Sequence, residues 1–201
     1  ALSIAGLTLD DVTFVEVASG EGARDSNNLG SLWAGLDELV KGKVDAVYVK
    51  GASAVEAARG RGLVVGIDLD GFPDRRTRVN NGTPRPITVH NSFLENHFDL
   101  VARFLAQTLR PADWAADNLQ SVYDVLKGET RAGDIGVAAA YRNDFHRSLH
   151  PDLSPERVDL FRIQKNFMWV HGFLDADFDL DAWIDPRPLE AARKLRAADP
   201  S

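Results

Sequence analysis

The sequence predicts an α/β fold in which a parallel-sheet lobe is followed by a C-terminal helical segment. The first observation is a set of short apolar, β-branched runs, typical of strands. The second is that residues 44–49 are almost entirely apolar, as in a strand that is covered on both faces of a parallel sheet. The third is the helical spacing of apolar residues between these runs, which predicts helices that connect parallel strands by right-handed crossovers. The predicted strands are residues 12–17, 44–49 and 63–67, and the predicted helices between them are 32–40 and 54–59.

Glycines mark the expected ends of the first helices. Residues 1–6 are expected to be the last turn of a helix, because Gly6 suits the left-handed position that follows one. A chain that opens in this way is expected to have lost its beginning. Gly42 is expected to end the helix over 32–40, and Gly60 or Gly62 to end the next one.

The periodicity disappears over residues 68–86, where Gly, Pro, Asn and Arg dominate. So long an irregular segment is unusual inside a compact domain, so it is expected to be functional, mobile or a crossing between lobes. Residues 86–90 are predicted to form a further short strand.

The remainder of the chain is expected to be helical. Ser92 and Glu95 have the spacing of a capping box, and Pro111 is expected to interrupt the helix that they open. Residues 135–149 predict a second helix. Ser154 with Pro155 predicts the start of a third, which Gly172 follows, and Asp185 with Pro186 predicts the start of a last helix.

Composition excludes several functional classes. The net charge is -7, and the basic residues are scattered, which argues against a broad nucleic-acid surface. No run approaches the length of a membrane span, and no signal peptide is visible. The chain has no cysteine, which removes disulfides, thiolate metal sites and a cysteine nucleophile from this chain. We expect no cofactor.

Four short strings, in this order along the chain, resemble the type II periplasmic binding proteins that serve sulfonate, nitrate and taurine ABC importers. They are GLTLDDV at residues 6–12, LVKGKVDA at 39–46, HNSFL at 90–94 and FDLDAWIDP at 178–186. The second is similar to the L-x-x-G-x-V-D-A string of that family. Each string is moderately specific, and their shared order carries the resemblance, which spans essentially the whole chain.

The resemblance implies two lobes that close on a ligand. Residues 1–83 would be most of the second lobe. Residues 84–201 would contain a crossover strand and helices that pack on a first lobe missing from this chain, which a separate polypeptide could supply. The protein would then be the solute-binding component of an ABC importer, with the permease as partner, in the periplasm or outside the cell. It would bind a small anionic or polar solute without transforming it.

The same branch of the fold contains an aromatic sulfinate desulfinase, which the tract from Tyr141 to Phe167 resembles. The alternative function is therefore a cytoplasmic C–S bond-cleaving enzyme, whose catalytic cysteine would lie in the missing N-terminal half. A cofactor-precursor enzyme on the same fold is a third reading. Both need residues that this chain does not contain.

Ligands of open α/β sheets bind beyond the carboxyl ends of the strands, where loops meet helix N-termini. This rule favours three loops, at 18–28, at 50–53 and at the start of 68–86. The first two carry cations, hydroxyls and flexible glycines. His90 ends a predicted strand that should face the region between the lobes. The predicted ligand-binding residues are Lys50, Gly51, Ser53, Ser19, Arg24, Asn28 and His90.

Each of these residues also has a structural interpretation. Lys50 and Arg24 could be solvated loop residues, and Ser53 a helix cap. His146 and His150 are four positions apart on a predicted helix, a spacing that invites a metal site. Because no third ligand accompanies them, we expect solvated or capping histidines and no metal.

Overall fold

The computed structural model describes residues 1–17, 30–79, 85–142 and 144–199. They form two compact units, each built from two stretches of sequence. Unit 1 contains Ala1–Ile67 and Asn118–Phe145, and unit 2 contains Asp68–Asp117 and His146–Ser201. The helices of unit 1 are η1 (Leu2–Ala5), α1 (Gly30–Val40), α2 (Ala52–Gly60), α5 (Leu119–Thr130) and α6 (Asp134–Ala140). Those of unit 2 are η2 (Leu69–Gly71), η3 (Arg75–Arg78), α3 (Asn91–Asn96), α4 (Phe98–Asp117), α7 (Pro155–Val170), α8 (Leu180–Trp183) and α9 (Arg187–Ala198). The turn η4 (Phe145–Arg147) spans their boundary in the sequence.

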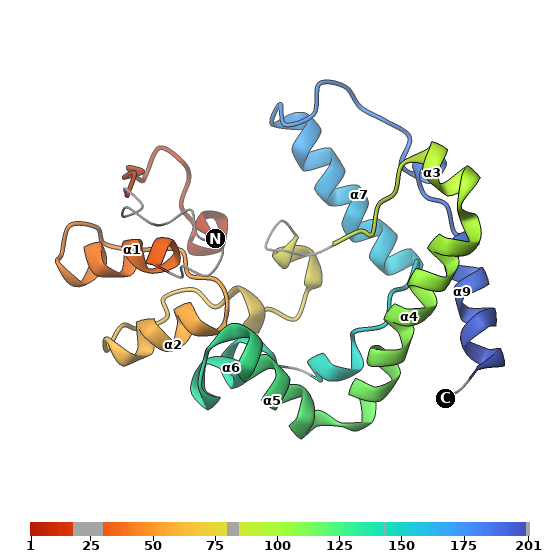
Figure 1. Ribbon diagram of the computed structural model, residues 1–201. Helices are drawn as coiled ribbons and strands as arrows, with labels where there is room; N and C mark the ends of the chain where they lie inside the picture. Colours follow the sequence, from red (N-terminus) through yellow and green to blue (C-terminus); the bar gives the residue numbers. More distant parts are fainter. Residues whose placement is uncertain (18–29, 80–84, 143, 200–201) are drawn as a thin grey trace. The chain divides into compact units, whose positions relative to one another are not determined.

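The prediction of an α/β fold with a parallel sheet is wrong. The part of the chain that the structure describes is mainly helical and contains no sheet (Figure 1). The four predicted strands, at 12–17, 44–49, 63–67 and 86–90, are irregular segments. The apolar composition of residues 44–49 predicts burial on two faces, yet Tyr48 in this run is 63% exposed. A strand also needs a neighbour to pair with, and composition alone does not supply one.

The predicted helix ends are confirmed at three glycines, Gly42, Gly62 and Gly172, which have φ of 69°, 72° and 73°. At each of them the next residue donates its backbone N–H five positions back, for example from Lys43 to Glu38 O at 3.0 Å. This hydrogen bond satisfies a carbonyl at the end of the helix, and the left-handed conformation that it requires is easiest for glycine.

In unit 1, α2 packs against α6, and the two helices lie side by side in Figure 1. The small core at this crossing contains Ala52, Ala132 and Val137, with Tyr123 and Tyr141 packed around it. Alanines and glycines allow the two backbones to come close.

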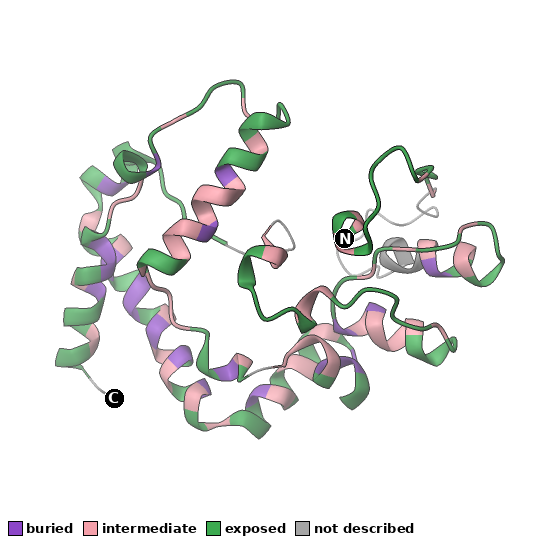
Figure 2. Cartoon of the chain, turned by 180° about the vertical axis from the view of Figure 1, so that it is seen from behind, coloured by how far each residue is buried: buried purple, intermediate pink, exposed green. Residues whose placement is uncertain are grey.

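In unit 2, α4 packs along α9 (Figure 1). Figure 2 shows the buried positions of α4 as a stripe along one side of the helix. Leu105, Ala106 and Leu109 from α4 form a core with Leu189 and Ala192 from α9.

The helix α4 continues through Pro111, so the predicted interruption there is wrong. A proline inside a helix costs about 3 kcal/mol. Buried residues lie on both sides of it, with Leu109 before and Ala112 and Ala115 after. The burial of this continuous face offsets the missing hydrogen bond.

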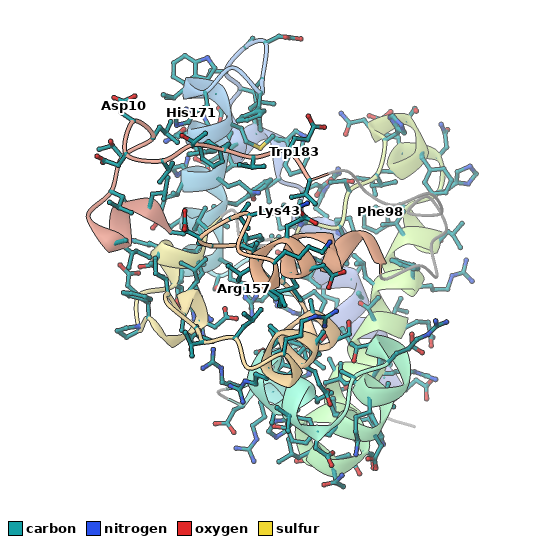
Figure 3. The ribbon with its side chains drawn as sticks, turned by 90° about the vertical axis from the view of Figure 1, so that its left-hand side faces the viewer. Asp10, Lys43, Phe98, Arg157, His171 and Trp183 are labelled. Carbon is teal, nitrogen blue, oxygen red and sulfur yellow. The ribbon has the colours of Figure 1, made fainter. Side chains whose placement is uncertain are left out.

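The helix α7 begins as predicted, with Ser154 as N-cap and Pro155 in the first turn. Near it, the ring of Trp183 (labelled in Figure 3) lies 5.5 Å from that of Phe161 and 6.1 Å from that of Phe178, measured between centroids. The amine of Lys165, which is only 8% exposed, pairs with the carboxylate of Asp177. These contacts attach the segment before α8 to α7.

Candidate functional site

The structure describes four of the seven predicted ligand-binding residues. Lys50, Gly51 and Ser53 lie in the turn that opens α2, with Gly51 as the N-cap at φ 89°. His90 is the exposed N-cap of α3 in unit 2. Ser19, Arg24 and Asn28 lie outside the described residues. Of the predicted ligand-binding residues that the structure describes, only Lys50, Gly51 and Ser53 lie together, and these are near neighbours in the sequence.

The turn before α2 offers little space for a ligand. The N-cap of α2 is Gly51, which has no side chain, so no side chain caps the N–H groups of the first turn. However, Ala52 and Ala54 are each only 1% exposed. A ligand could therefore reach Lys50 and Ser53 but not the whole first turn.

A hollow in unit 2 is a better candidate. It has a volume of about 420 Å³, is open to solvent, and lies between the C-terminal parts of α4 and α9 and the segment that precedes α7. Its lining combines three basic side chains, two carboxylates and a few apolar groups. The lining residues are Leu109, Asp113, His150, Pro151, Asp152, Arg193, Arg196 and Ala197.

Asp113 forms hydrogen bonds to two other residues that line the hollow. One carboxylate oxygen lies 2.8 Å from Nε2 of His150, and the other accepts a hydrogen bond of 2.8 Å from Nε of Arg196. These hydrogen bonds, from His150 first and Arg196 second, hold the pKa of Asp113 below its ordinary value. The carboxylate thus ties α4 to α9 and to the segment at residue 150.

The opposite wall is fixed by Asp152. Its carboxylate accepts a hydrogen bond of 2.9 Å from the backbone N–H of Ser154 and forms an ion pair of 2.7 Å with Nε of Arg157. Arg157 is labelled in Figure 3, on the first part of α7. Both carboxylates of the hollow therefore already have partners within the protein.

Arg193 is the lining cation that remains available. Its side chain is exposed, and among the described residues no carboxylate lies within ion-pair distance of it. Arg196, in contrast, bonds Asp113 and the backbone oxygen of Asp199. Both arginines belong to the last turns of α9, where the partial negative charge of the helix end opposes an anion. The hollow can therefore bind an acid group, but only weakly.

Sequence reasoning missed this hollow. His150 was expected to share a helix with His146, but that helix ends at Ala140, and only the short turn η4 follows. His146 is buried, and its Nδ1 has no hydrogen-bond partner among the described residues, whereas His150 bonds Asp113. Asp113 lies 37 positions from His150 and 83 from Arg196, so no local pattern connects them.

Comparison with protein-family models, curated proteins and solved structures finds no match to this chain. The resemblance to type II binding proteins therefore depends on the short strings alone. Within the described ranges, no helix is both long and apolar enough to cross a membrane. The same residues contain no group of three or more His, Asp or Glu side chains that could hold a metal ion.

Proposed function

We propose that the protein captures a small polar solute with an acid group, such as a sulfonate, nitrate or taurine, and delivers it to the permease of an ABC importer. The observation that carries the binding step is the exposed Arg193 in the wall of the hollow. A guanidinium presents a planar fork of donors that matches the oxygens of such groups. The delivery step is supported only by the resemblance of the four strings.

The charges around the hollow favour one kind of solute. Asp113 and Asp152 repel a simple anion, while Arg193, Arg196 and His150 can attract one. A zwitterion such as taurine places an ammonium and a sulfonate in the same site, so we expect taurine to bind more tightly than methanesulfonate or nitrate. A single exposed charged contact contributes about 1.5–3 kcal/mol, which by itself corresponds to a dissociation constant between about 5 and 80 mM.

The test is a calorimetric titration with taurine at constant ionic strength. Arg193→Gln should weaken binding about tenfold, which corresponds to about 1.4 kcal/mol. Lys194→Gln is the matched control, because Lys194 is the next residue of α9, is exposed and does not line the hollow. An equal loss in both variants would show that only general charge matters. A loss in Lys50→Ala with none in Arg193→Gln would move the site to the turn before α2.

A further inference from the structure

The hydrogen bond between His150 and Asp113 fixes which ring nitrogen of the histidine carries the proton. Nε2 of His150 lies 2.8 Å from a carboxylate oxygen of Asp113. An ionised carboxylate can only accept hydrogen bonds, so Nε2 must be the donor. In the neutral ring the other nitrogen, Nδ1, therefore has no proton and presents a lone pair.

Nδ1 of His150 is accessible to a ligand. The side chain of His150 is 39% exposed and lines the hollow of unit 2. Nδ1 has no hydrogen-bond partner among the residues that the structure describes. A lone pair repels the oxygens of an acid group, whereas a protonated Nδ1 donates a charge-assisted hydrogen bond to them. An acid group therefore gains this contact only when the ring takes up a proton.

The charge of the hollow also depends on His150. Besides this histidine, the lining contains two carboxylates and two guanidiniums, those of Asp113, Asp152, Arg193 and Arg196. Arg157 of α7 pairs with Asp152 but does not line the hollow. The charges of the lining therefore cancel while His150 is neutral, and one net positive charge remains once His150 is protonated.

We propose that His150 contacts the acid group of the solute through Nδ1 and takes up a proton as the solute binds. This proposal rests on the function proposed above, and it adds a second contact to that of Arg193. Because the two equilibria are linked, the solute strengthens proton binding by the same factor by which the proton strengthens solute binding. Such coupling usually amounts to about fivefold or more, and we expect the lower end because the ring is partly exposed.

Taurine should then bind more tightly as the pH falls. Histidine is the side chain that ordinarily changes its charge between about pH 5 and pH 8. Neither the sulfonate nor the ammonium group of taurine changes its charge between pH 6 and pH 8. The dissociation constant of taurine should therefore fall by up to about fivefold from pH 8 to pH 6.

The experiment is a titration of the full chain with taurine at pH 6, 7 and 8 and constant ionic strength, followed by NMR of the histidine ring protons. This measurement suits weak binding, and the buffers must contain no sulfonate. The chain has five histidines, and the signal of His150 is the one that His150→Gln lacks. At pH 7, taurine should move this signal toward its low-pH position. The signal of His90, an exposed residue of unit 2 outside the hollow, should not move.

Two variants separate His150 from the other histidines. His150→Gln has no group that titrates at this position, so its affinity for taurine should be the same at pH 6 and pH 8. His90→Gln is the matched control and should keep the pH dependence of the wild type. Circular dichroism checks that both variants keep their helices.

The possible failures are distinguishable. If taurine binds but the His150 signal does not move toward its low-pH position, or the affinity does not rise as the pH falls, this proposal is wrong and solute binding through Arg193 stands. A pH dependence that persists in His150→Gln would assign the proton to another group and would also overturn it. If taurine binds at none of the three pH values, the solute-binding proposal fails, and this one fails with it.

Discussion

Replacing Gly136 with alanine tests whether the crossing of α2 and α6 requires a glycine. A Cβ added at Gly136 would lie 2.4 Å from the backbone oxygen of Ala52 and 2.9 Å from the Cβ of Glu56. Real Cβ atoms do not approach so closely, so one helix must move. Ala52 is only 1% exposed and opens α2, so its carbonyl cannot move without shifting the helix. Overpacking of this kind costs about 1–3 kcal/mol.

Gly128 provides the matched control. It lies inside α5 of the same unit, and a Cβ added there meets nothing within 4 Å. In a helix interior, alanine is about 0.5–1 kcal/mol more favourable than glycine. Gly128→Ala should therefore raise the free energy of unfolding by about that amount, whereas Gly136→Ala should lower it by about 1–3 kcal/mol.

Urea unfolding followed by circular dichroism measures both changes. Because the chain has two units, hydrogen exchange of the amides in α2 and α6 should accompany it, so that the change is assigned to unit 1. If Gly136→Ala is as stable as Gly128→Ala, the backbones of α2 and α6 leave room for a Cβ at Gly136, and the explanation of the crossing is wrong.

Two further predictions concern charged side chains of unit 2. The pKa of Asp113 is lowered by His150 and Arg196, so its stabilisation is present above the unfolded-state pKa, about 4, and is lost as the pH falls through the lower folded-state value. The urea midpoint of Asp113→Asn should therefore fall less than that of the wild type between pH 5 and pH 2, and parallel pH profiles would contradict this role. Asp177→Ala should lower the free energy of unfolding, but by less than breaking a fully buried pair would, because Lys165 is buried whereas Asp177 is 41% exposed. Adding Lys165→Met should recover part of that loss in thermal unfolding, and a double variant no more stable than Asp177→Ala would refute the pairing.

The sequence predicted features that depend on a few adjacent residues. Gly42, Gly62 and Gly172 end their helices, and Pro155 opens α7 in its first turn. These signals are local, because a positive φ or a missing N–H acts on the nearest turn only.

Features that depend on distant parts of the chain were not predictable in the same way. The apolar runs were interpreted as strands, but pairing depends on a neighbour that composition does not reveal. The helix α5 was not predicted, and α4 passes through Pro111 because it packs on α9, which begins more than seventy residues later. The predicted capping box at Ser92 is wrong as well, since His90 is the N-cap of α3.

The candidate site residues also fall into a group that is local in sequence and a group that is not. Lys50, Gly51 and Ser53 lie together because they are neighbours in sequence. Asp113, His150 and Arg196 lie together because of the way unit 2 folds. A search for short motifs can find the first group and cannot find the second.

Each unit joins two separate stretches of sequence, and carboxylates form hydrogen bonds between the two stretches in both units. In unit 1, Glu56 accepts hydrogen bonds from the backbone N–H groups of Gly133 and Gly136, at the start of α6. In unit 2, Asp113 bonds His150 and Arg196. We expect Glu56 to contribute more to stability than Asp113. Glu56 is half-buried and bonds backbone groups, whereas Asp113 is 43% exposed and bonds side chains that water can also reach. The loss of Glu56 should therefore separate α2 from α6, while the loss of Asp113 should open the hollow and leave α4 packed on α9.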